Sequence, residues 1–95
     1  MVLFLLITGE GQAWHHIVEQ NATNISNFGA EQIHNTKNLI RLQHGKGSIH
    51  AKVSGYYSSI QPFSNGVPVR KWLSSQSYNT QSNFGIKTLK MYGWK

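Results

Sequence analysis

The stretch that decides the expected fold is HGKGSIHAKV, residues 44–53. Its two glycines suit a tight turn. After the turn, Ile49, Ala51 and Val53 alternate with two polar residues, which is the two-residue period of a half-buried strand. The segment before the turn, residues 39–44, is rich in apolar side chains. The pattern therefore predicts an antiparallel hairpin with its turn near Lys46.

Working outward from this hairpin, turn signals separate further short segments that are typical of strands. Residues 19–38 are rich in Asn, Ser and Thr, and we expect them to form loop and short irregular strand. The other predicted strands span residues 56–60, 67–78 and 84–94, with turns at residues 64–66 and 79–83. Five to six short strands without a convincing helical period predict an all-β fold, a small antiparallel β-sandwich.

The first residues have the pattern of an export signal. Residues 2–7 read VLFLLI, and Gly11-Gln12-Ala13 has the small-x-small form of a signal-peptidase site. The run is too short to span a bilayer, which needs about 20 apolar residues. We therefore expect a signal peptide over residues 1–13, a single β-sandwich domain over residues 14–95, and a secreted protein. The alternative is that residues 2–7 form a buried first strand.

Composition excludes several classes of site. The chain has no Cys and no Asp, and its only acidic residues are Glu10, Glu19 and Glu31. It therefore forms no disulfide and no thiolate metal site. It also lacks the carboxylates that a two-carboxylate glycosidase or a calcium loop requires. No glycine-rich phosphate-binding motif occurs. We expect no enzyme, no catalytic residues and no cofactor.

The charge is strongly one-sided. The formal net charge is +6, and all nine Lys and Arg residues follow the last glutamate, Glu31. Such a chain attracts anionic partners. For an exported protein, the expected partner is an anionic cell-wall precursor or the membrane surface of target bacteria, and not nucleic acid. The alternative is a charged surface that only keeps the protein soluble.

The predicted binding site lies on the two expected hairpins. Lysine and arginine would supply positive charge, and a tryptophan would anchor the protein at the membrane–water boundary. The residues predicted to form this site are His44, Lys46, His50, Lys52, Arg70, Lys71 and Trp72.

Histidines leave a metal site open as an alternative. His44 and His50 would face each other across the hairpin, and either His15 or His16 could complete a three-histidine zinc site. Solvent-facing histidines are equally typical of such a basic, hydrophilic stretch. We therefore expect no metal, and zinc titration would test this expectation.

Several motifs together resemble the lactococcin 972 family of secreted, cysteine-free bacteriocins. They are the Trp14-His15-His16 start of the expected mature chain, the His-Gly turn and second His of residues 44–53, the basic-Trp segment of residues 69–74, and the Lys-rich aromatic end of residues 87–94. The resemblance implies a β-sandwich toxin that binds a lipid-linked cell-wall precursor and blocks septum formation. The polar stretch of residues 21–38 departs from the family's tyrosine-rich segment.

The sequence thus predicts a secreted cationic antibacterial protein that binds an anionic envelope component. The runner-up is a non-toxic exported module that binds the cell surface or cell wall. A growth-inhibition assay would separate the two.

Overall fold

The described part of the chain folds into a small antiparallel sheet and five α-helices. The structure is a computed structural model that describes residues 7–9, 12–43 and 45–95. The strands are β1 (Ile7–Gly9), β2 (Gln12–His16) and β3 (Leu39–Gln43), in the spatial order β1-β2-β3. The helices are α1 (Ala22–Phe28), α2 (Ala30–Ile33), α3 (Ile49–Ser58), α4 (Val69–Leu73) and α5 (Tyr78–Met91), with 3₁₀ turns at Thr36–Asn38 and Pro62–Ser64.

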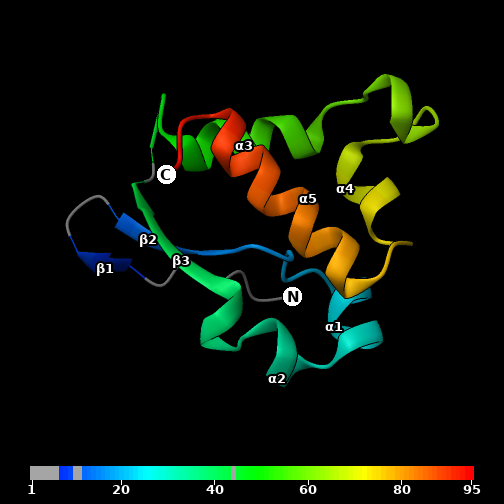
Figure 1. The fold of residues 1–95 in the computed structure, drawn as a ribbon, viewed down its shortest axis with the longest axis horizontal. Coiled ribbons are helices and arrows are strands. Elements are labelled where there is room, and N and C mark those ends of the chain that lie inside the picture. The colour runs from blue at the N-terminus through cyan, green and yellow to red at the C-terminus, as the bar shows by residue number, and fades with distance from the viewer. Residues whose placement is uncertain (1–6, 10–11, 44) are drawn as a thin grey trace.

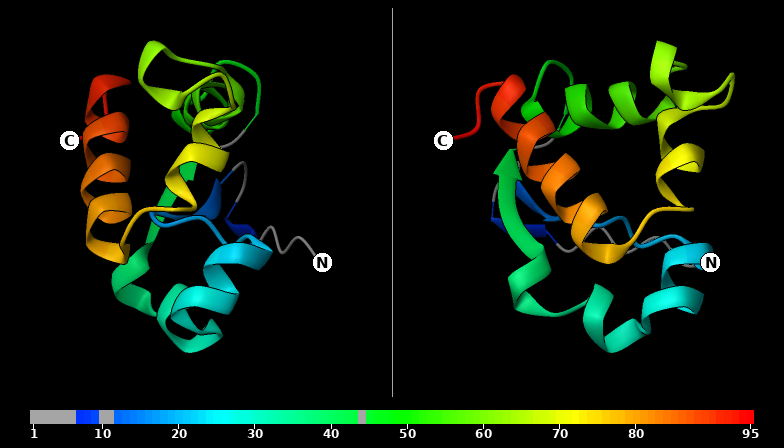
Figure 2. Two further views of the ribbon diagram at one scale, coloured as in Figure 1. Left: turned by 90° about the vertical axis from the view of Figure 1, so that its right-hand side faces the viewer. Right: turned by 45° about the vertical axis from the view of Figure 1, so that its right-hand side comes forward.

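The helices form two groups joined by the longest helix. α3 and α4 pack together at one end of the molecule, and α1 and α2 lie together at the other end (Figure 1). α5 runs from one group to the other, and both views in Figure 2 show this arrangement. α3 also contacts β3. The sheet therefore packs against the helix that follows β3 in the sequence.

The predicted β-sandwich is wrong, and the stretch of residues 44–53 shows why. Residues from Ile49 onward begin α3, because the hydroxyl of Ser48 accepts a hydrogen bond from the backbone N–H of Ala51 at 3.1 Å and caps the helix. The buried residues of α3 are Val53 and Tyr57, four positions apart, which is helical spacing. Over so few residues, Ile49 and Val53 fit a strand and a helix equally well.

The predicted C-terminal strand is also wrong, since residues 78–91 form α5. The side chain of Ser77 caps this helix by accepting from the backbone N–H of Thr80. The buried positions are Gln81, Gly85, Thr88 and Leu89, a helical stripe in which only one residue is a large hydrophobe. Polar residues on the buried side hid the helical period from a search for apolar residues.

Two local features predicted from the sequence, a strand and a turn, are present in the structure. The strand predicted over residues 39–44 is confirmed as β3 over Leu39–Gln43. The turn at Asn65-Gly66 is also confirmed, with positive φ values of 56° and 77°. However, the turn leads into α4 and not into the predicted strand, because Pro68 stands at the N-cap and residues 69–73 are helical.

The polar segment of residues 19–38, predicted to be loop and irregular strand, contains α1 and α2. The carbonyl of the Asn21 side chain accepts from the backbone N–H of Asn24 at 2.8 Å and starts α1. Asn24 is buried and exchanges two amide hydrogen bonds of 3.0 Å with Gln81 of α5. Side chains typical of loops thus serve as caps and as buried ties between helices.

The expected cleavage site lies within the sheet. Ala13 belongs to β2, is fully buried, and pairs with Leu42 of β3. Of the apolar run of residues 2–7, only Ile7 is among the described residues, and it belongs to β1. Cleavage after Ala13 would remove β1 and the first two residues of β2. The signal peptide itself stays a prediction.

The core lies where α3, α4 and α5 meet the sheet. Its buried members are Ile17, Leu42, Val53, Tyr57, Val69, Leu73 and Leu89. Gly85 lets α5 approach the backbone after β2 closely. A Cβ at this position would lie 2.6 Å from the carbonyl oxygen of Ile17, so only glycine fits without movement.

Candidate functional site

A pair of histidines meets between the sheet and α3. Side chains alternate along β2, so that His15 and the buried Ala13 share one face of the sheet. His15 pairs in register with Ile40 of β3, and α3 packs on that strand. His50, in the first turn of α3, brings its ring to 5.4 Å from that of His15, with an angle of 88° between the ring planes.

The environment keeps His15 neutral. Burial, followed by the nearby imidazoles of His50 and His16, lowers its pKa to about 4. At neutral pH, one ring nitrogen of His15 therefore carries a free lone pair. A neutral imidazole nitrogen is the form in which histidine binds a metal ion.

The separation of the two rings fits two ligands of one metal ion. With metal–nitrogen bonds of about 2.1 Å and a tetrahedral angle, two imidazole centroids lie about 5 Å apart. The observed 5.4 Å is close to this separation. Among residues 7–9, 12–43 and 45–95, no group of three or more His, Cys, Asp or Glu could hold a metal. Any metal at His15 and His50 would thus take its other ligands from water, from a substrate or from outside the described residues.

A second histidine pair lies on the other face of the sheet. Nε2 of His16 is 3.0 Å from Nδ1 of His34, so one nitrogen donates to the other. His16 is buried, and its pKa is lowered to about 4 by burial and then by His34. These two nitrogens bond to each other, so one nitrogen of each ring is occupied.

Asn38 holds the two ends of the connection between β2 and β3 together. Its side chain is buried and accepts from the backbone N–H of Val18 at 2.8 Å. The same amide donates to the carbonyl oxygens of Val18 and Ile33 at 2.9 and 2.8 Å. It therefore ties the end of β2 to the segment that leads into β3.

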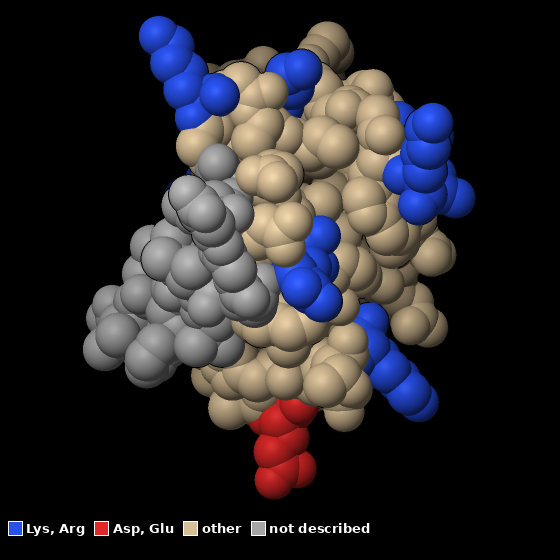
Figure 3. Space-filling view, turned by 90° about the vertical axis from the view of Figure 1, so that its left-hand side faces the viewer, with Lys and Arg blue, Asp and Glu red and all other residues tan. Residues whose placement is uncertain are grey.

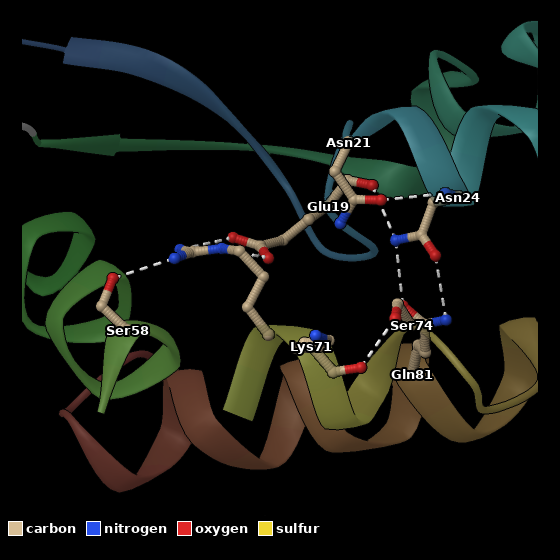
Figure 4. A network of polar contacts seen from close by, with 8 residues as sticks. Glu19, Asn21, Asn24, Ser58, Lys71, Ser74 and Gln81 are labelled. Atoms are coloured by element: carbon tan, nitrogen blue, oxygen red, sulfur yellow. Dashed lines mark hydrogen bonds and ion pairs between the residues drawn. The ribbon is translucent and has the colours of Figure 1, made fainter. Parts of the chain in front are cut away.

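A polar network joins the chain after β2 to α3 and α4 (Figure 4). The guanidinium of Arg70 donates to both carboxylate oxygens of Glu19, with Nε 2.8 Å from Oε1 and Nη2 2.9 Å from Oε2. Nη1 of Arg70 donates to the hydroxyl of Ser58 at 2.9 Å. This bidentate pairing raises the pKa of Arg70 and fixes the orientation of its guanidinium.

An open groove of about 560 Å³ lies beside this network. Its lining includes hydroxyl, amide and cationic groups, but apolar atoms make up the larger part of its surface. The lining residues are Asn21, Thr23, Ser58, Pro68, Arg70, Lys71 and Ser74.

The structure divides the predicted binding site. Arg70 and Lys71 both line the groove, whereas His50 lies at the other end of α3 beside His15. Lys46 and Lys52 are exposed near the start of α3. His44 lies outside the described residues. Because the two hairpins do not exist, the reason for grouping these residues is lost.

Trp72, predicted to be an interfacial anchor, is half-buried. Its ring lies 5.1 Å from that of Phe63 and 6.2 Å from that of Phe84. It packs against the core cluster, as most aromatic residues of a small domain do.

The positive charges do not gather into one patch on the face drawn in Figure 3. There, Lys and Arg side chains stand apart, with uncharged surface between them. Long-range attraction by the net charge remains, but local recognition must come from particular clusters.

Sequence reasoning missed Glu19, Ser58 and Asn38. Asn38 gave no signal, because a buried asparagine and a loop asparagine look alike in a sequence. The only available hint for Glu19 was that few acids exist to pair with nine bases.

Comparison with protein-family models, with curated proteins and with solved structures found no match. The resemblance to the lactococcin 972 family thus stays a prediction. None of the helices in the described part of the chain is both long and apolar enough to cross a membrane.

Proposed function

We propose that the protein is a metal-dependent hydrolase of phosphodiester bonds in nucleic acid, with His15 and His50 as the metal ligands. The observation that carries this proposal is the meeting of these two imidazoles, 5.4 Å apart, between β2 and α3. Imidazole ligands favour transition ions such as Zn²⁺, Ni²⁺ or Co²⁺.

The charge of the ligand set supports hydrolysis of an anion. Imidazole binds a metal in its neutral form, so a divalent ion held by His15 and His50 would keep its full charge. Two protein ligands also leave coordination positions for water and for a substrate oxygen. Such an ion polarises a phosphoryl oxygen and lowers the pKa of a bound water, which supplies a nucleophile at neutral pH.

The net charge supports a polyanionic substrate. Nine Lys and Arg residues against three glutamates attract a polymer that carries a phosphate on every unit. Nucleic acid presents such charges at a spacing of about 3.4 Å along each strand. The sequence-based expectations of no enzyme and no nucleic-acid partner stay predictions, and the assays below decide between them and this proposal.

The test measures metal uptake and cleavage by the full chain. We expect the purified protein to bind Zn²⁺ or Ni²⁺ in calorimetry and to cleave labelled single-stranded or duplex DNA, with chelator abolishing cleavage. The variants His15→Ala and His50→Ala should each reduce cleavage by about 100-fold or more, since each removes a metal ligand. The matched control is His34→Ala, which removes an exposed histidine outside the pair and should keep the uptake.

Either of two results would refute the proposal: no uptake of these metals at neutral pH, or cleavage that persists in the His50→Ala variant. Circular dichroism checks that each variant is folded. A folded variant that binds no metal has lost a ligand, whereas an unfolded variant does not test the site.

A second candidate is the secreted antibacterial protein that binds an anionic envelope component. The observation in its favour is the groove with Arg70 and Lys71 in its lining. Replacing both residues with Ala should then weaken binding to vesicles of anionic lipid or to lipid-linked cell-wall precursor. Unchanged binding, or no growth inhibition of any test bacterium by the wild-type protein, would count against this candidate.

A further inference from the structure

One polar side of α3 connects the histidine pair to the groove. His50, Ser54 and Ser58 are spaced four residues apart, which places them along one side of the helix. Ser54 and Ser58 are exposed, and Ser58 lines the groove. At a rise of about 1.5 Å per residue, the eight residues from His50 to Ser58 span about 12 Å.

The groove holds hydrogen-bond donors that the fold leaves available. The guanidinium of Arg70 is hydrogen-bonded to Glu19 and Ser58. It forms part of the groove wall, and the carboxylate of Glu19 offsets its charge. Lys71 is exposed, and within the described part of the chain no carboxylate lies at ion-pair distance from it. Thr23 and Asn21 line the same groove, and the side-chain oxygen of Asn21 accepts from the backbone N–H of Asn24.

The charge of the groove fits a single phosphodiester. Glu19 offsets the charge of Arg70, and Lys71 supplies one positive charge in excess. A phosphodiester carries one negative charge and has oxygens that accept hydrogen bonds from an ammonium, a hydroxyl and an amide.

We propose that this groove, with Lys71 as its cation, binds a second phosphate of the nucleic-acid strand whose scissile phosphate lies at His15 and His50. This inference rests on the proposed function. The ~12 Å along α3 are longer than one phosphate-to-phosphate step of a single strand, so at least one further phosphate lies between the two bound ones. The exposed hydroxyls of Ser54 and Ser58 give the strand a polar path along α3 between the two points.

The test compares two lysine variants of the full chain. Binding of a fluorescent single-stranded 12-mer is measured by anisotropy over a series of salt concentrations, with chelator present to prevent cleavage. Lys71→Ala should lower the slope of log K against log salt by about 0.7, the value for one lost phosphate contact on a single strand. Lys87→Ala removes an equal charge from an exposed position of α5 outside the groove, and its slope should stay at the wild-type value.

Equal slopes for the two variants would overturn the proposal. The same conclusion follows if the loss in Lys71→Ala appears with vesicles of anionic lipid and not with the oligonucleotide. Cleavage with metal present gives the second readout. Lys71→Ala should raise KM for the 12-mer and leave KM for a dinucleotide unchanged, because a dinucleotide cannot reach the groove.

These readouts separate failure of the groove from failure of the proposed function. A slope that depends on Lys71 without any cleavage would refute the hydrolase and keep the groove as a phosphate site. Cleavage that depends on His50 with no effect of Lys71 would refute the groove alone.

Discussion

The two histidine pairs on the two sides of β2 are alike in composition and opposite in organisation. His15 meets His50 edge to face across the α3-facing side of the sheet, and its environment keeps it neutral. His16 hydrogen-bonds to His34 on the other side and is buried. Two residues that are adjacent in the sequence therefore belong to different sites.

The difference teaches that pairing state, more than residue type, decides what a histidine can do. A nitrogen that bonds to another histidine contributes to stability and is occupied. A neutral nitrogen without such a bond can bind a ligand. Experiments that remove one pair at a time should therefore separate stability from metal binding.

We expect Asn38→Ala to cause the largest loss of stability. It should disrupt both histidine pairs, so that they no longer differ. The substitution leaves the backbone N–H and carbonyl of Val18 and the carbonyl of Ile33 without their buried partner. At about 1–3 kcal/mol for each unsatisfied group, we expect a loss of about 3 kcal/mol or more in urea unfolding.

The control for Asn38→Ala is Asn35→Ala, which removes an exposed cap hydrogen bond to the N–H of Lys37 and should cost about 1 kcal/mol or less. Similar losses in the free energy of unfolding for the two variants would show that Asn38 does not hold the connection between β2 and β3.

Acid should destabilise the protein through both pairs. The pKa of His15 and that of His16 are about 4 in the folded protein and about 6.5 in the unfolded chain. The unfolded state therefore binds more protons as the pH falls from 6.5 to 4, and stability is lost over that window. For His16 alone, the lowered pKa corresponds to a loss of about 3 kcal/mol in the free energy of unfolding once the pH has fallen to 4. Urea unfolding at several pH values measures this loss.

His16→Gln should remove about half of the pH dependence and leave the part due to His15. If the variant keeps the full dependence on pH, the lowered pKa of His16 is not a source of acid instability.

His34→Ala should have a smaller effect, confined to the second pair. It removes one hydrogen bond and leaves Nε2 of His16 without this partner, at a cost of about 1–2 kcal/mol. Affinity for Zn²⁺ or Ni²⁺ should match the wild type, as measured by calorimetry. A fall in metal affinity as large as that of His50→Ala would mean that the two pairs act as one site.

Glu19→Gln should have the smallest effect. The ion pair with Arg70 is partly exposed, with 37% and 25% of the two side chains accessible, so its loss should cost about 1 kcal/mol or less. The freed charge of Arg70 should strengthen binding to the single-stranded 12-mer. Weaker binding would show that the fixed orientation of Arg70 matters more than its charge.

Part of this structure was accessible from the sequence. β3 and the Asn65-Gly66 turn follow from local patterns that no tertiary contact overrides. α3 and α5 did not follow, because short apolar spacing around Ile49 fits two periods and because α5 buries Gln81 and Thr88. Both polar residues are stabilised by partners that only the folded chain provides.

The candidate site was accessible only as an alternative. The sequence raised a zinc site that combined His50 with His15 or His16, but it based this on a hairpin that does not form. The meeting of His15 and His50 depends on how α3 packs against β3, and a single sequence does not reveal such packing.

The contact between Gly85 and Ile17 gives α5 a single axial setting on the chain after β2. Sliding by one residue would bring Phe84 or Ile86 to the position where even one added carbon does not fit. The position of α5 along its axis is therefore fixed relative to the chain after β2. On the ribosome, β2 emerges well before α5, so this part of the core can close only after α5 has been synthesised.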